Sequence, residues 1–374
     1  MIVTGLLLAG LFYHNPLATV PVVAILGLLY WLVKYNYRFW EIDGVPFPKP
    51  SMLVGNLGPT LMLKKHISQL ADGWYNAFPN ATFVGYFKLF TPAIMVRDPE
   101  LVKNILTRDF DCFATNDIVV DSAQDPLLVH DAFLATGERW KRSRALLTPS
   151  FTGAKIKQLF PTMNSVGDAF QAFVGQHVSK EVEAKELANS PDVQEKLFQE
   201  IKKQIDANDG NLDYDVLQKI EYLDWVMLET LRMHPPAATM LKLSTKKYIM
   251  RRGERDSQGH DLGIYVREGT PILIPVLAIH MDPKYYPEPQ KFDPERFSPD
   301  RKVEYRGTVF MPFGEGPRMC LGMRFGQAQV KLALVKLILN YRVNIGPNHK
   351  PFCVDPRSMV YQSKHGIRVV FEKR

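Results

Sequence analysis

One cysteine near the C-terminus stands in a segment whose residue types suit a metal ligand. The segment, residues 313–322, reads FGEGPRMCLG and holds Phe313, Gly314, Gly316, Arg318, Cys320 and Gly322. A thiolate is a strong metal donor, and a nearby arginine and a helix start both favour the deprotonated thiol. A lone cysteine is more often an inert core residue. The surrounding glycines would let the backbone approach a flat ligand, and the full spacing F-x-x-G-x-R-x-C-x-G favours a metal ligand at Cys320 over that alternative.

Two charged residues upstream have a spacing that could support such a site. Glu229 and Arg232 are three residues apart, so one helix face would carry both charges and the two side chains could pair. On an exposed helix such a pair contributes little to stability. A further arginine, Arg296, follows in the segment FDPERF, between this pair and Cys320.

The type and order of these motifs resemble the cytochrome P-450 family, in particular its microsomal, animal-type members, insects included. The pattern F-x-x-G-x-R-x-C-x-G around Cys320 is specific, and Glu229-Thr230-Leu231-Arg232 is similar to the E-x-x-R element of the family. The resemblance implies that Cys320 is the axial thiolate ligand of haem b, held in a loop with Phe313, Gly314, Arg318 and Gly322. It also implies that Glu229, Arg232 and Arg296 lock this loop.

The resemblance extends to residues that would bind the haem propionates. Trp140-Lys141-Arg142-Ser143-Arg144 is similar to the W-x-x-x-R helix of the family, where the indole N–H and the arginine bind a propionate. Arg318 is expected to contribute as well. Family members often have another arginine in the strand after the E-x-x-R helix, and Lys242 stands there in this chain. A lysine keeps the charge and loses the two-pronged geometry of a guanidinium.

One stretch that typical members contain is missing. The interval from Trp140 to Glu229 is less than half as long as theirs, and the element A/G-G-x-D/E-T-T/S of the oxygen-binding helix is absent from the sequence. We expect an internal deletion near 176–186. Splitting dioxygen requires a distal acid and alcohol, so the sequence predicts no catalytic pair. Loss of the distal helix should also expose apolar surface and lower stability or favour aggregation.

The first 35 residues predict a membrane anchor. No Asp, Glu, Lys or Arg occurs among residues 1–33, and residues 16–33 are long enough to cross a hydrocarbon core. A cleaved signal peptide is the alternative, but the basic start of such a peptide is missing. The first cations, Lys34 and Arg38, follow the span. They predict a luminal N-terminus and a cytoplasmic body at the endoplasmic reticulum membrane, where the microsomal members lie.

The distribution of prolines and the spacing of apolar residues divide the chain into regions and predict its fold class. Residues 36–60 are rich in proline and are expected to form an extended hinge, and residues 61–374 are expected to form one haem-binding domain. Helical spacing dominates 137–171, 190–205 and 214–234, with a β-hairpin expected at 81–97 around Thr91-Pro92 and short strands at 248–275. The sequence predicts a mainly α fold with small β-sheets, namely an incomplete cytochrome P-450 fold plus a transmembrane helix.

Composition limits the class of protein and its partners. With 374 residues, 46% of them hydrophobic, the chain can bury a large core and is neither disordered nor fibrous. Its three cysteines, Cys112, Cys320 and Cys353, are too few and scattered for a disulfide framework. The net charge of +7 fits an anionic membrane or an acidic protein. No block of basic residues stands out, and no nucleic-acid partner is expected.

Three functions remain open. The resemblance implies a monooxygenase that inserts one atom of O2 into a hydrophobic small molecule, with electrons from NADPH through a reductase. That acidic reductase would dock on a basic face near Arg139, Lys141, Arg142 and Arg324. The deletion favours a catalytically inactive truncated or splice form with weak or no haem binding. A membrane-tethered interaction module without haem would leave the conjunction of motifs unexplained.

Overall fold

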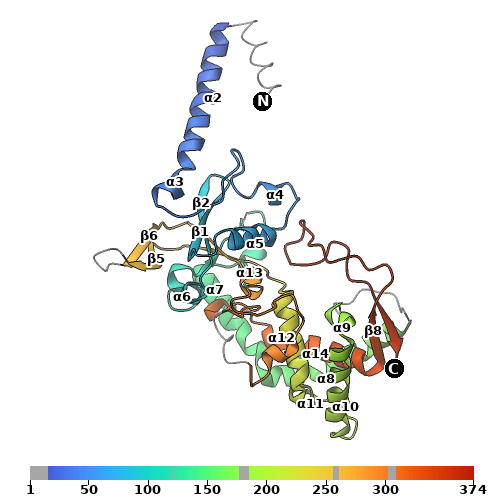
Figure 1. The fold of residues 1–374 in the computed structure, drawn as a ribbon. Helices are drawn as coiled ribbons and strands as arrows, with labels where there is room; N and C mark the ends of the chain where they lie inside the picture. The colour runs from blue at the N-terminus through green and yellow to red at the C-terminus, as the bar shows by residue number, and fades with distance from the viewer. Residues whose placement is uncertain (1–15, 119, 122, 177–184, 256–260, 302–308) are drawn as a thin grey trace.

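The computed structural model describes residues 16–118, 120–121, 123–176, 185–255, 261–301 and 309–374 (Figure 1). The first 15 residues of the predicted anchor lie outside this part, as do residues 177–184, which make up most of the predicted deletion site. A long N-terminal helix stands clear of the body, and the rest of the chain folds below it (Figure 1).

The described elements are mainly helices, as predicted. The α-helices are α2 (Pro16–Asn36), α3 (Phe39–Ile42), α4 (Gly58–Leu61), α5 (Ile67–Ala77), α6 (Pro99–Leu106), α7 (Gly137–Leu147), α8 (Gly153–Gln176), α9 (Lys185–Asn189), α10 (Pro191–Asp206), α11 (Tyr214–Lys219), α12 (Glu221–Met233), α13 (Val276–His280) and α14 (Met323–Asn340). Short 3-10 helices are η1 (Phe110–Cys112), η2 (Leu128–His130), η3 (Thr148–Phe151), η4 (Pro294–Phe297) and η6 (Gly316–Arg318).

The strands form one larger sheet and two hairpins. The five-stranded sheet has the order β1-β2-β7-β4-β3. Its strands are β1 (Phe83–Lys88), β2 (Thr91–Val96), β3 (Thr115–Asn116), β4 (Met240–Leu243) and β7 (Pro271–Ile274). The hairpins pair β5 (Tyr248–Arg255) with β6 (Asp261–Val266), and β8 (Tyr341–Ile345) with β9 (Val369–Lys373). The predicted hairpin at 81–97 is present, but its turn is at Leu89 and Phe90, because Thr91 and Pro92 already pair with β1.

Two apolar cores hold the body together. One lies around the five-stranded sheet, and the other joins α8, α10, α12 and α14 to the β8–β9 hairpin. Leu197, Ile201 and Ile205 of α10, which forms the predicted helix at 190–205, are buried in the second core. The predicted helix at 214–234 is instead two helices. Ile220 is not helical, and the backbone N–H of Tyr222 donates to the Glu200 carboxylate at 3.1 Å.

The N-terminal helix is exposed and its foot is fixed to the body. The stretch Val20–Ile42 is long and apolar enough to cross a membrane, and only 6% of its most apolar window is buried. Just after α2, the Tyr37 hydroxyl donates to backbone carbonyls, among them that of Leu89 at 3.2 Å. The proline-rich segment is extended and lies against β1, where the N–H of Gly85 donates to the Pro46 carbonyl at 2.9 Å. Its role as a hinge stays a prediction.

Candidate cofactor site around Cys320

The cysteine loop is closed by its own backbone. The N–H of Cys320 donates to the carbonyl of Phe313 at 2.8 Å, and the N–H of Gly314 donates to that of Met311 at 3.0 Å. The thiol is free and exposed. Helix α14 begins at Met323, with Gly322 as the residue before its first turn. Cys320 therefore sits three residues ahead of a helix, on a loop whose shape does not depend on its side chain.

The glycines of the loop are required for two different reasons. Gly314 and Gly316 have φ of 72° and 69°, a backbone conformation that L side chains rarely adopt. At Gly316 a Cβ would also lie 1.9 Å from the carbonyl oxygen of Leu106, so helix α6 and the loop touch backbone to backbone. Gly322 has an ordinary φ and room for a side chain, with Phe151 as its nearest neighbour at 3.7 Å. Approach to a flat ligand, the predicted reason, is not needed to explain Gly314 and Gly316.

Arg318 is held by three backbone carbonyls and one aromatic ring. Its guanidinium donates to Ala114 at 2.6 Å, to Phe133 at 3.2 Å and to Ala135 at 2.7 Å. The same group lies 4.5 Å from the centre of the buried Trp140 ring. Sequence reasoning could not find these partners, because a backbone carbonyl leaves no residue signature. The contacts fix the guanidinium beside α7, the helix that carries Trp140.

Two more cations lie close to Arg318. Lys242 on β4 is 4% exposed, and its ammonium donates to the Asn116 side chain at 2.9 Å. Burial, with the charge of Arg318 as the second cause, lowers the pKa of Lys242 to about 8. Burial likewise lowers the pKa of Arg318 to about 10, with the charge of Arg144 as the second cause. Within the described residues, none of these three cations has a carboxylate partner.

This arrangement fits a cofactor that carries its own metal and its own anions. Buried cations that repel one another are stabilised by an anionic ligand, and the indole of Trp140 has no hydrogen-bond partner among the described residues. The described chain also contains no cluster of three His, Cys, Asp or Glu residues able to hold a metal ion. A single thiolate such as Cys320 therefore suits a metal whose other donors belong to the ligand, and haem has both these donors and two carboxylates.

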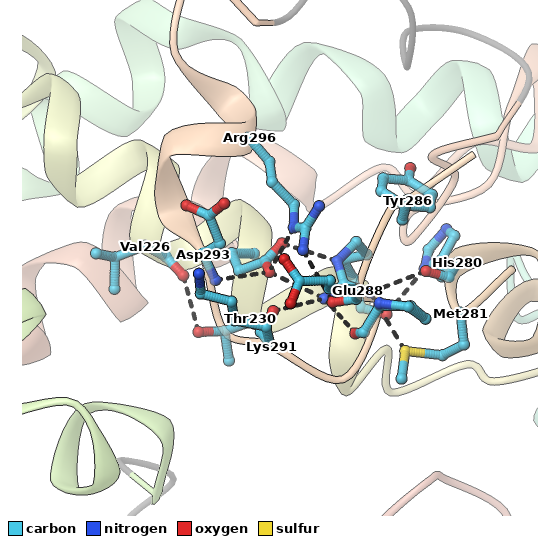
Figure 2. A network of polar contacts seen from close by, with 12 residues as sticks. Val226, Thr230, His280, Met281, Tyr286, Glu288, Lys291, Asp293 and Arg296 are labelled. Atoms are coloured by element: carbon cyan, nitrogen blue, oxygen red, sulfur yellow. Dashed lines mark hydrogen bonds and ion pairs between the residues drawn. The ribbon is translucent and has the colours of Figure 1, made fainter. Parts of the chain in front are cut away.

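A buried charge network joins α12 to η4 and to the segment before η4 (Figure 2). Glu229 and Arg232 are fully buried and form a two-pronged ion pair at 2.8 and 2.9 Å, in contrast to the exposed pair that this spacing often gives. Arg296 is the second cation that pairs with Glu229, and its Nε lies 3.4 Å from the Glu229 carboxylate. The N–H of Asp293 also donates to Glu229 at 3.0 Å. The three residues singled out in the sequence are thus brought together.

The network reaches the cysteine loop through His280, which sequence reasoning missed. Arg232 donates to the carbonyl of His280 at 2.9 Å, and the N–H of Met311 donates to the His280 ring at 3.0 Å. Met311 in turn accepts from Gly314 inside the loop. Burial lowers the pKa of His280 to about 3, so its ring is neutral and can accept. A lone histidine in an apolar run gave no signal of this role.

The region around α7 and α8 is much less covered. Large apolar side chains are exposed on η2, α7 and α8 and on the loops beside them: Leu127 83%, Phe133 61%, Leu146 79%, Leu159 46%, Val166 64% and Phe173 44%. Helix α8 packs on α14 along one face, where Gly167 meets Leu332. Such exposure is the expected result when helices that would cover α7 and α8 are missing.

The predicted docking cations are exposed around the start of α7 and of α14. Arg139, Lys141 and Arg142 lie on α7, and Arg324 lies on α14. Lys141 is paired with Glu138 at 2.6 Å, so it adds less free positive charge than the others. Phe151, at the end of η3 after α7, contacts the start of α14, since its ring lies 6.3 Å from that of Phe325.

Comparison with known proteins identifies a family. The sequence model of the family Cytochrome P450 matches residues 45–186 and 184–371. Among the similar curated proteins, Cytochrome P450 6B1 of Papilio polyxenes is 26% identical over 510 residues, covering 96% of this chain and 99% of the relative. Cytochrome P450 6a8 of Drosophila melanogaster is 24% identical over 503 residues, covering 94% and 97%.

The same comparisons locate the missing stretch. Both alignments are longer than the whole chain of 374 residues, so part of each relative has no counterpart here. The family model matches in two pieces, and these pieces meet at residues 184–186. The shorter chain is therefore consistent with the predicted internal deletion, and the two matched pieces meet near its predicted position, between α8 and α9.

Proposed function

The chain belongs to the cytochrome P450 family, and we propose that it is a membrane-attached haem-thiolate monooxygenase in which Cys320 binds the iron. The observation that supports this most directly is the convergence of an exposed thiol, a buried indole and three cations without carboxylate partners within the described residues. When bound, the haem would supply the oxygen-activating chemistry.

The residues of this chain would bind and orient the cofactor. Cys320 would donate its thiolate to one face of the iron. Arg318, Trp140, Arg144 and Lys242 would donate to the propionates, and a bound carboxylate would favour the charged form of Lys242. The role proposed for the buried Glu229 network is to hold the cysteine loop rigid through His280 and Met311.

Electrons would come from NADPH through an acidic reductase docked on the basic face formed by Arg139, Arg142 and Arg324. All three side chains are exposed, and the net charge of the chain is +7. Association steered by charge slows as salt is added. Replacing Arg139 and Arg142 with Gln should weaken reductase-dependent reduction at low salt and leave reduction by dithionite unchanged.

The membrane attachment has its own test in this chain. We propose that α2 crosses the endoplasmic reticulum membrane with the body on the cytoplasmic side. Asn80-Ala81-Thr82 is an acceptor sequence for N-glycosylation, and Asn80 is exposed. Expression with microsomes should leave Asn80 without a glycan. Endoglycosidase-sensitive glycosylation that Asn80→Gln abolishes would place the body in the lumen and contradict the proposed orientation.

The proposed substrate class is a hydrophobic small molecule. The exposed apolar residues of α7 and α8, with Leu146 and Val166 among them, offer a surface that such molecules would contact. A substrate that partitions into lipid would also reach a body attached to the membrane.

A second candidate function is a form that does not turn over. The two matched pieces of the family model meet at residues 184–186, between α8 and α9, where the sequence predicts the loss of the acid and alcohol that deliver protons. Such a form would keep the Cys320 loop and lack dioxygen splitting.

Two measurements on the purified full chain separate the candidates. A reduced carbon monoxide difference spectrum with the Soret band at the thiolate position supports haem-thiolate ligation, and its absence overturns it. NADPH consumption coupled to product formation with a reductase then supports the monooxygenase. Thiolate ligation with no product, tested across a panel of hydrophobic substrates, identifies the non-catalytic form.

A further inference from the structure

A small crevice lies at the foot of α2, apart from the Cys320 site. Its volume is about 160 Å³, and its walls come from α3, the start of β2, and the end of β6 with the turn that follows. Figure 1 shows these elements gathered just below α2. Its lining side chains include three aromatic residues and two opposite charges: Phe39, Trp40, Tyr265, Arg267 and Glu268.

The aromatic wall is held rigidly. The indole N–H of Trp40 donates to the carbonyl of Tyr86 at 3.0 Å, and its ring lies so close to Gly85 that a Cβ there would be 2.5 Å away. Phe39 packs edge-on against Trp40, with ring centres 4.8 Å apart. Tyr265 is 53% exposed at the mouth of the crevice. Such a group of rings attracts ammonium groups, above all quaternary ones.

The two charges stand next to each other in the chain. The guanidinium of Arg267 lies 5.6 Å from the centre of the Phe39 ring, and Glu268 follows it directly. Within the described residues, neither side chain takes part in an ion pair. A simple anion would be repelled by Glu268 and a simple cation by Arg267. A zwitterion satisfies both, with its phosphate on Arg267 and its ammonium group on Glu268 and the rings.

The position of the crevice indicates where such a zwitterion comes from. Phe39 follows the last residue of α2, Asn36, by three positions, and the Asn36 side chain donates to the carbonyl of Phe90 at 2.8 Å. If α2 crosses the hydrocarbon layer, the crevice lies in the polar layer beside it. The volume equals that of about five water molecules, enough for a headgroup and too small for an acyl chain.

We infer that this crevice binds the phosphocholine headgroup of a zwitterionic phospholipid. The inference rests on the membrane attachment in the proposed function and is independent of haem binding. Bound headgroups would hold the body at one height and one orientation on the bilayer, because α3 is fixed to β1 by Trp40.

Calorimetric titration of the full chain in a neutral detergent tests this site. The probes are dihexanoylphosphatidylcholine and dihexanoylphosphatidylglycerol, each below its micelle concentration. We expect about tenfold tighter binding of the choline lipid, and about a tenfold loss of that binding in Arg267→Gln, as for one charged hydrogen bond. Glu268→Gln should bring the two affinities together. Arg357→Gln changes another exposed arginine, on a different loop, and should alter neither affinity.

Three results would overturn the inference. One is equal affinity for the two lipids in the unchanged chain. Another is choline-lipid binding that neither Arg267→Gln nor Glu268→Gln alters while both variants keep their melting temperature. The third is tighter binding of the glycerol lipid, which would indicate an anion site. Flotation with vesicles reports membrane attachment separately, so a chain that fails to float contradicts the attachment, while the lipid titration still reads the crevice.

Discussion

The two sides of the chain around the cysteine loop differ in how completely their groups are partnered. In the network that reaches the loop through His280, Glu229 and Arg232 are fully buried, and the Arg232 guanidinium also donates to backbone carbonyls. Around α7 and α8, apolar side chains such as Leu146 and Val166 are largely exposed. We call the first region the locked side and the second the α7–α8 face. The locked side lies wholly after residue 186, so the deletion removes none of its partners.

This contrast shows that a chain can form the sequence motifs of the family while another region beside them stays uncovered. The locked side can form because its charges are satisfied within a few neighbouring elements, α12, α13 and η4. On the α7–α8 face, large apolar side chains such as Leu146 and Val166 stay exposed, as expected if covering helices are missing. We therefore expect the deletion to reduce the folding stability of the chain more than it reduces ligand binding at the Cys320 loop.

The largest expected effect comes from the thiol itself. Cys320→Ala should abolish the thiolate Soret band in the reduced carbon monoxide spectrum, because no other cysteine lies in the loop. Cys353→Ala changes another exposed cysteine and is the matched control. Equal loss of the thiolate Soret band in both variants would contradict the assignment of Cys320 as the iron ligand.

The next effect measures the locked side. Glu229→Ala leaves the buried Arg232 without its carboxylate and should lower the free energy of unfolding by about 3–5 kcal/mol, measured by urea denaturation. Glu138→Ala breaks an exposed pair with Lys141 and should cause no measurable change. A small effect of Glu229→Ala would mean that the network does not hold the loop.

A smaller effect depends on pH. The pKa of Lys242 is about 8 in the folded protein, mainly through burial, against about 10.4 in an unfolded chain. Between these values the unfolded chain binds more protons, so stability rises with pH. Relative to Lys242→Met, the haem-free chain should gain roughly 2 kcal/mol between pH 7.5 and pH 10.

The control for this pH effect is the exposed Lys247, whose change to Met should not alter the slope. Haem binding should flatten the profile, because a propionate favours the charged lysine. Parallel curves for the unchanged chain and Lys242→Met would contradict the lowered pKa.

The smallest stability effect is expected on the α7–α8 face. Leu146→Glu with Val166→Glu should change the unfolding free energy little and reduce aggregation, measured by size-exclusion chromatography, because both side chains already contact water. Leu332→Ala removes a buried side chain from α14 and should cost about 2–5 kcal/mol. Loss of stability in the double variant would show that the face is covered in solution.

The sequence predicted those parts of the site that follow from local spacing. The pairing of Glu229 with Arg232 needs only one helical turn, and the loop around Cys320 is closed within eight residues. The mainly α fold with small sheets followed from periodicity. The family model confirms the resemblance on which the haem assignment rests.

The remainder depends on contacts between distant segments. Nothing in the run around His280 marks it as the link to Met311, since a single histidine has no spacing to read. The crevice likewise joins Phe39 to Arg267, which no local pattern relates. The break at Ile220 was missed because the carboxylate of Glu200 competes for the N–H of Tyr222.

The residues on both sides of the predicted deletion pack against the same apolar core. Val174 near the end of α8 and Leu187 on α9 are buried in the same core as Tyr341, and Glu186 pairs with His234 at the end of α12 at 2.9 Å. A segment spliced in between residues 176 and 185 would begin and finish beside this core. Helices inserted at this point would therefore leave the contacts of α8 and α9 with the core unchanged.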